Sequence, residues 1–182
     1  MELESLERLL LAARERSRHT EYVVVGSLSI LGVTRERPVP ERMLMSRDVD
    51  CYTRNDPGKI FELQDELGEG GPFDQCHGYY LDPVSPSLPT LPDGWEHRLV
   101  EVALASGIRA YFLDPNDAAV SKYARGDRRD REWLRTGLRA GLLSIPIIDC
   151  RFGQTSFFDA AEDRRAHDLL REDEAWLAGA KE

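Results

Sequence analysis

The chain lacks the features that mark several special classes of protein. It has no apolar run long enough to cross a membrane, no signal-peptide pattern at its N-terminus, and no internal repeat or low-complexity tract. Its three cysteines, Cys51, Cys76 and Cys150, are scattered, and Cys76-His77 has no second ligand pair to complete a zinc site. The sequence therefore argues against a membrane protein and a disulfide-stabilised secreted protein, and we expect a cytoplasmic protein with reduced thiols.

Lysine is scarce as well, since three lysines stand against 21 arginines, and the net charge is −9. An acidic protein is a poor candidate for general nucleic-acid binding. The charge is uneven, because residues 122–139 hold seven basic and three acidic residues, whereas residues 159–182 hold eight acidic and four basic ones. The basic segment can hold a polyphosphate, or it can be a solvated helix face with ion pairs between successive turns.

The rest of the composition is that of a folded domain, because 182 residues with 41% hydrophobic and 31% charged side chains can bury a proper core. Apolar residues at helical spacing predict helices at residues 2–18, 27–33, 59–67 and 130–143, another that opens at Asp114-Pro115, and a C-terminal one with Leu169, Leu170, Trp176 and Leu177 on its packing face. Short β-branched or alternating runs predict strands at residues 22–25, 44–52, 78–82, 98–104 and 108–112, with Ser106-Gly107 as a hairpin turn. This mixture predicts an α+β fold.

The end of the first predicted strand carries Gly26-Ser27. Glycine allows a sharp backbone turn at this point, and Ser27 is a candidate N-cap for the helix that follows. Free amide groups at a helix N-terminus bind anions. The pattern is typical of a phosphate-binding corner.

Asp48 and Asp50 lie two residues apart in a predicted strand, so both carboxylates point to the same face while Val49 points to the other. Two adjacent carboxylates repel each other unless a cation lies between them, and oxygen ligands suit Mg²⁺ or Mn²⁺. The alternative is a pair of exposed aspartates that cap the next turn. Together with Gly26-Ser27, the pair favours a metal site.

Lys122 lies on a predicted helix in which Ala118, Ala119 and Tyr123 are apolar positions. Its ammonium group can pair with the outer phosphates of a nucleotide. The alternative is a lysine whose stem packs on the helix while its charge reaches solvent. Arg125 and Arg128 are weaker candidates for the same phosphate contact.

Further motifs follow in order along the chain: Leu91-Pro-Asp-Gly-Trp95 with Arg98-Leu-Val, then Leu113-Asp-Pro-Asn-Asp117, Ser121-Lys122 and Arg125-Gly-Asp-Arg-Arg-Asp130. With the glycine–serine and aspartate pairs, this set resembles the minimal nucleotidyltransferases. More narrowly, it resembles an uncharacterised bacterial branch related to the nucleotidyltransferase-like proteins of toxin–antitoxin pairs. The resemblance implies a polymerase-beta-like nucleotidyltransferase fold with a mixed sheet and flanking helices over residues 1–143. Residues 144–182 are then a helical extension packed on the same domain. The loop at residues 34–41 makes the spacing between the two pairs longer than in the simplest members.

The resemblance also implies a Mg²⁺- or Mn²⁺-dependent enzyme that moves NMP from NTP to a hydroxyl on a small molecule, a protein or RNA. Gly26, Ser27, Lys122 and Arg125 are the expected nucleotide-binding residues, and Asp48 and Asp50 are the expected metal ligands and catalytic residues. Active members carry a third catalytic carboxylate, for which Asp82 is our first choice and Glu101 the second. The alternative is an inactive protein of this fold that acts as an antitoxin-like component and binds a protein partner encoded alongside.

Overall fold

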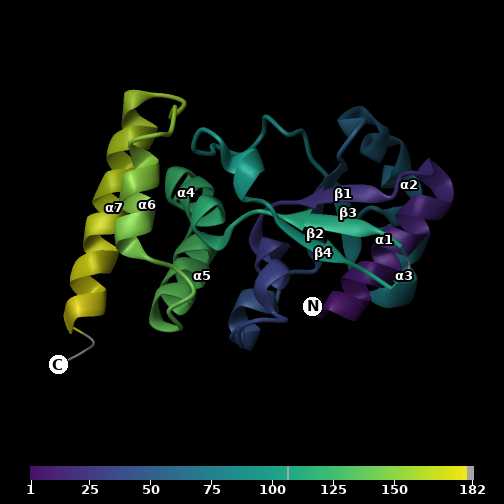
Figure 1. Ribbon diagram of the computed structural model, residues 1–182, viewed down its shortest axis with the longest axis horizontal. Helices are drawn as coiled ribbons and strands as arrows, with labels where there is room; N and C mark the ends of the chain where they lie inside the picture. Colours follow the sequence, from purple (N-terminus) through teal and green to yellow (C-terminus); the bar gives the residue numbers. More distant parts are fainter. Residues whose placement is uncertain (106, 180–182) are drawn as a thin grey trace.

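The computed structural model describes residues 1–105 and 107–179 (Figure 1). Within these residues, one mixed sheet has the strand order β3-β2-β1-β5-β4. The central strand β1 runs parallel to β5 and antiparallel to β2, while β3 is parallel to β2 and β4 is antiparallel to β5. The strands are β1 (Glu21–Val24), β2 (Asp48–Thr53), β3 (Tyr80–Pro83), β4 (Val100–Ala103) and β5 (Arg109–Phe112). This architecture agrees with the predicted α+β class and is compatible with a nucleotidyltransferase fold.

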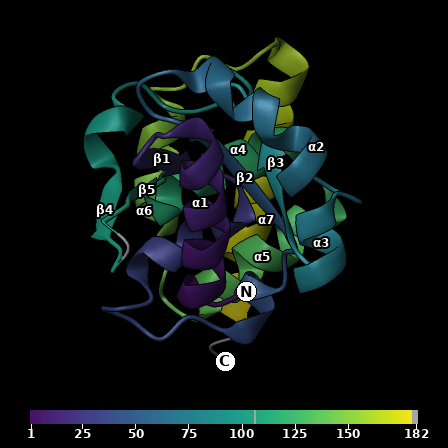
Figure 2. The same ribbon diagram turned by 90° about the vertical axis from the view of Figure 1, so that its right-hand side faces the viewer.

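Helix α1 (Leu3–Ser17) lies against the sheet, as Figure 2 shows, and it confirms the predicted N-terminal helix. The side chains that share its inner face, Leu6, Leu9, Leu10 and Ala13, are fully buried. The short helices α2 (Gln64–Leu67) and α3 (Pro72–His77) lie beside β3. The burial of the leucine face follows from its helical spacing and joins α1 to the main core.

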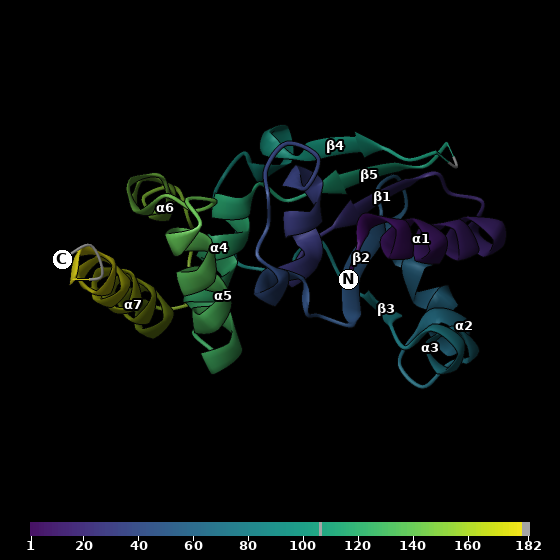
Figure 3. The ribbon, with the colours of Figure 1, turned by 90° about the horizontal axis from the view of Figure 1, so that it is seen from below.

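Four helices gather on the other side of the molecule: α4 (Pro115–Arg125), α5 (Arg128–Arg139), α6 (Ile145–Phe152) and α7 (Ala160–Gly179). Figure 3 shows α4 between the sheet and α7, and α4 packs against each of the other three. Asp173 of α7 is fully buried, where it accepts hydrogen bonds from Tyr123 and from two arginines of α5, Arg131 and Arg135. Helices α4 and α5 pack with helices beyond residue 143. The division into a domain at residues 1–143 and a helical extension stays a prediction.

Two segments predicted as helices are 3₁₀-helical rather than α-helical. These segments are η1 (Ser27–Val33), which covers a whole predicted helix, and η3 (Pro57–Leu63), which replaces most of another. A third 3₁₀ turn, η2 (Glu41–Leu44), follows Pro40, so the strand predicted from residue 44 begins only at Asp48. The fourth, η4 (Trp95–Arg98), delays the next strand to Val100. Turns of 3₁₀-helix are frequent as connectors between other elements.

The boundary of one α-helix also differs from its prediction. The helix predicted at residues 130–143 spans Arg128–Arg139, because Gly141 adopts a positive φ of 65° that ends it. The apolar residues from Ile145 onward begin α6. Of the predicted hairpin turn, Ser106 lies outside the described residues, while the Gly107 amide donates to the Leu104 carbonyl oxygen at 3.1 Å. Among the described helices, none combines the length and the apolarity that crossing a membrane requires.

Candidate active site

The sheet register brings three carboxylates together. Asp50 on β2 lies opposite Asp82 on β3, and Asp48 lies opposite Tyr80. One oxygen from each of Asp48, Asp50 and Asp82 lies within 4.8 Å of the other two. Glu101, the second choice for the third carboxylate, lies on β4 at the other edge of the sheet, where it pairs with Arg109 at 3.7 Å. The geometry therefore favours Asp82 and excludes Glu101 from the cluster.

The three carboxylates repel one another in a partly desolvated place. Burial first, and then the charges of Asp48 and Asp82, raise the pKa of Asp50 to about 7. Partial burial and the charges of Asp48 and Glu69 also raise the pKa of Asp82. Val49 between the first two aspartates is fully buried on the opposite face, as the alternation of a strand requires. A divalent cation would relieve this repulsion, and an all-oxygen donor set suits Mg²⁺ or Mn²⁺.

Gly26 forms the wall against which Asp50 lies. Its φ of 64° and ψ of −153° fall in a region that is essentially restricted to glycine. A Cβ atom at this position would lie 1.9 Å from Oδ2 of Asp50. The Val25 amide also donates to the Asp50 carbonyl oxygen at 2.9 Å, which holds the two backbones together. Gly26 is therefore needed both for the turn and for the close approach of the carboxylate.

Ser27 is not the N-cap that its sequence position suggests, because Gly26 occupies the cap position and makes no side-chain cap. Its Oγ instead accepts a hydrogen bond of 2.8 Å from Nζ of Lys122. An ammonium group can only donate, so the hydroxyl proton of Ser27 stays available to a ligand oxygen. The phosphate contact predicted for Ser27 stays a prediction, and its hydroxyl group is the donor that would make it.

Lys122 is 3% exposed, which makes the solvent-reaching alternative wrong. Nζ pairs with Oδ1 of Asp130 at 2.9 Å and lies 4.9 Å from the ring centroid of Trp133. Burial lowers the pKa of Lys122, an effect that Asp130 opposes. Burial alone would raise the pKa of Asp130, but the hydrogen bonds and charges of Arg125 and Lys122 lower it. The pair is therefore a buried ion pair next to Ser27.

Arg125 and Arg128 are placed differently from Lys122. The guanidinium of Arg125 donates to both carboxylate oxygens of Asp130, at 2.6 Å each. Arg128 has a side chain that is 94% exposed, and it pairs with Glu132 at 3.8 Å. The phosphate contacts predicted for Lys122 and Arg125 stay predictions, and in this structure both side chains already pair with Asp130.

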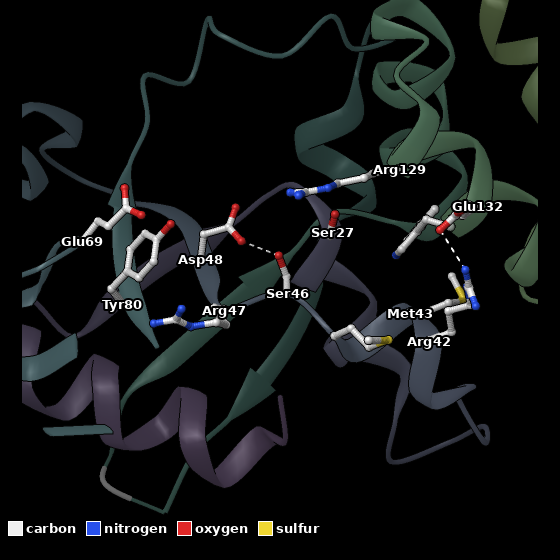
Figure 4. Close-up of a pocket in the computed structure, with 12 residues that line it drawn as sticks. Ser27, Arg42, Met43, Ser46, Arg47, Asp48, Glu69, Tyr80, Arg129 and Glu132 are labelled. Atoms are coloured by element: carbon white, nitrogen blue, oxygen red, sulfur yellow. Dashed lines mark hydrogen bonds and ion pairs between the residues drawn. The ribbon is translucent and has the colours of Figure 1, made fainter. Parts of the chain in front are cut away.

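A cavity of about 660 Å³ opens beside the cluster (Figure 4). Asp48 belongs both to the cluster and to the cavity wall, and the Ser46 hydroxyl donates to its carboxylate. Ser27, Glu69 and Tyr80 also line the cavity, as do Arg129 and Trp133 from α5. Arg129 lies inside the motif at residues 125–130 that the sequence already showed, whereas Glu69, Tyr80 and Trp133 belong to no motif. Only its place in the basic segment, three residues after Asp130, could have drawn attention to Trp133.

Trp133 forms part of the cavity wall and is 5% exposed. Its Nε1 is buried and has no hydrogen-bond partner within residues 1–105 and 107–179. The ring itself is occupied, because the Lys122 ammonium lies over it. Trp133 thus contributes to the position of Lys122 and, through it, of Ser27.

Comparison with protein families supplies the decisive observation. A family model described as "Nucleotidyltransferase of unknown function (DUF6036)" matches residues 2–179. The chain belongs to this nucleotidyltransferase family. Comparisons with curated proteins and with solved structures find no match. The family match extends over both the sheet and the four-helix part of this nucleotidyltransferase.

Proposed function

We propose that this nucleotidyltransferase transfers NMP from NTP to a hydroxyl acceptor in a Mg²⁺- or Mn²⁺-dependent reaction. The observation that carries the proposal is the cluster of Asp48, Asp50 and Asp82 beside Gly26-Ser27, next to a cavity of about 660 Å³ that Asp48 and Ser27 line. Nucleotide transfer needs this combination, because a triphosphate must be held while a cation neutralises the carboxylates around it. A cytoplasmic location in a bacterium would supply both NTP and Mg²⁺.

Each residue has a defined task in the proposed reaction. Asp48 and Asp50 would hold the metal ion, and Ser27 would donate its hydroxyl proton to a phosphate oxygen. A bound Mg²⁺ or Mn²⁺ would neutralise the charge that develops on the phosphate oxygens. Asp82 is the carboxylate best placed to receive the acceptor proton, because it is partly exposed and its pKa is raised.

The transfer itself exchanges one phosphorus–oxygen bond for another. The acceptor oxygen bonds to the α-phosphorus, and its proton passes to the carboxylate of Asp82. The bond between the α-phosphorus and the oxygen that bridges to the β-phosphate breaks, and pyrophosphate leaves with the electron pair. The proposed acceptor is a hydroxyl group of a small molecule, a protein or RNA.

Calorimetry with each NTP, in Mg²⁺, Mn²⁺ or EDTA, tests the metal site. We expect metal-dependent NTP affinity in the wild type, and the double variant Asp48→Asn, Asp50→Asn should lose that dependence while its unfolding curve stays cooperative. Glu101→Gln is the matched control, because it changes an acid of the same sheet outside the cluster. Equal NTP affinity in EDTA and Mg²⁺ would contradict the proposal.

Labelling with α-³²P-NTP then separates catalysis from binding. We expect transfer of label to a component of a mixture that contains cellular RNA, proteins and small molecules. Metal-dependent binding without any transfer would instead support the alternative, an inactive relative that acts as an antitoxin-like, partner-binding component. A protein partner encoded alongside, as in toxin–antitoxin pairs, belongs to that alternative.

A further inference from the structure

Three arginines line the cavity, and two of them already have partners. Arg42 pairs with Glu132 at 2.9 Å. Arg47 pairs with Asp74 at 2.8 Å and donates to the Gly78 carbonyl oxygen at 2.6 Å. These interactions neutralise both guanidinium groups within the protein.

Arg129 is different, because its exposed side chain makes no hydrogen bond or ion pair with any residue in the described part of the chain. In Figure 4 it points from α5 toward the side of the cavity on which Asp48 lies. The two cations that the sequence favours for phosphate binding, Lys122 and Arg125, are both bound to Asp130. Arg129 is thus a cationic side chain of the cavity wall that can pair with a ligand without breaking an existing ion pair.

We propose that Arg129 binds the pyrophosphate portion of the NTP, an inference that rests on the function proposed above. Transfer occurs at the α-phosphate, which must lie at the carboxylate cluster where the acceptor is activated. The β- and γ-phosphates must then extend elsewhere in the cavity, and they carry the charge that leaves with pyrophosphate. A planar guanidinium donates two parallel hydrogen bonds to phosphate oxygens.

The charges of the cavity support this polarity. Asp48 and Glu69 make one side acidic, and this side would repel phosphates that no metal ion screens. Arg129 and the Ser27 hydroxyl offer donors to the same cavity from α5 and from the turn after β1. The β- and γ-phosphates therefore have a favourable place near Arg129, away from Glu69.

The test compares Arg129→Ala with Arg128→Ala, two exposed arginines that are neighbours on one helix and whose loss changes the net charge equally. Arg128 does not line the cavity and pairs with Glu132 instead. Calorimetry at fixed Mg²⁺ measures the affinity of the full chain for pyrophosphate, for each NTP and for the corresponding NMP. Thermal unfolding verifies that both variants fold.

We expect Arg129→Ala to weaken the binding of pyrophosphate and NTP by about 10- to 100-fold, the usual effect of losing charge-assisted hydrogen bonds. NMP affinity should change by less than about threefold, and Arg128→Ala should leave all three affinities within about twofold. Arg129→Lys should recover only part of the lost affinity, because lysine keeps the positive charge but lacks the two parallel N–H donors of a guanidinium.

Four outcomes would overturn the inference, and three of them concern pyrophosphate or the control variant. These are an unchanged pyrophosphate affinity in Arg129→Ala, an equal loss in Arg128→Ala, and wild-type protein that binds NTP but not pyrophosphate. The fourth is an equal loss of NMP affinity, which would place Arg129 at the α-phosphate or the nucleoside, the parts that NMP and NTP share. If wild-type protein fails to bind any NTP in a metal-dependent way, the proposed function itself fails, and this result is distinct from all of the others.

Discussion

Replacing Gly26 by alanine is the sharpest single test of the site geometry. The added Cβ would lie 1.9 Å from Oδ2 and 2.8 Å from Cγ of Asp50, far inside van der Waals contact. The backbone cannot move apart freely, because the Val25 amide is bonded to the Asp50 carbonyl oxygen. The carboxylate of Asp50 must therefore rotate away from its place in the cluster.

The expected cost has two parts. A side chain in the glycine-restricted region of Gly26 costs about 1–3 kcal/mol, and the overlap with Asp50 adds about 1–3 kcal/mol. We expect the free energy of unfolding to fall by about 2–6 kcal/mol in total. For a chain of 182 residues, each kcal/mol lowers Tm by about 2–4 °C.

Urea denaturation and calorimetry with NTP and Mg²⁺ measure the two effects separately. Gly78→Ala is the reference, because Gly78 also has a positive φ, of 76°, but a Cβ there would meet no atom within 4 Å. This variant should lose only the left-handed backbone cost of about 1–2 kcal/mol and keep the affinity of the wild type for NTP. Gly26→Ala should lose more stability and most of its metal-dependent NTP affinity.

The reasoning would be refuted if both variants lost the same stability and Gly26→Ala kept its metal-dependent affinity. That result would show that the carboxylate of Asp50 can leave its observed position without consequence for the metal.

Three further predictions concern the same residues. Asp82→Asn should abolish label transfer from α-³²P-NTP while calorimetry shows unchanged NTP affinity; retained transfer would remove Asp82 from catalysis. In EDTA, the free energy of unfolding should fall as pH rises from about 4 to about 7, because Asp50, with a folded pKa of about 7, binds its proton more tightly than an unfolded aspartate. Asp50→Asn should flatten this pH dependence in urea titrations, and an unchanged slope would contradict the assignment. Lys122→Met should lower the free energy of unfolding by an amount near the lower end of about 3–5 kcal/mol, because the buried Asp130 loses one cation but keeps its ion pair with Arg125. Adding Asp130→Leu should recover part of this loss.

Local patterns in the sequence predicted most of the elements correctly. The leucine spacing of the first helix and the β-branched run at residues 22–25 are local signals, which can be recognised without knowledge of the tertiary contacts. The two carboxylates of Asp48 and Asp50 share a face because successive side chains of a strand alternate. Gly26-Ser27 could be recognised as a turn, although the helix that follows it is 3₁₀ and Ser27 does not cap that helix.

The third carboxylate was only a choice between Asp82 and Glu101 before the strands were paired. The parallel register of β2 and β3 places Asp82 beside Asp50, and the strand order places Glu101 at the far edge. Strand order depends on contacts between residues distant in sequence, which periodicity does not encode.

The sequence by itself determined which residue types this protein brings to the site: a glycine–serine turn, an aspartate pair and a basic helical segment. Only the tertiary structure decided which basic residues form ion pairs within the protein. Lys122 and Arg125 converge on Asp130, and Lys122 also reaches Ser27, 95 positions away in the chain. Arg129 lines the cavity and has no ion pair with the residues that the structure describes. The physical reason is that a buried cation must find an anion, and packing alone determines which cations are buried.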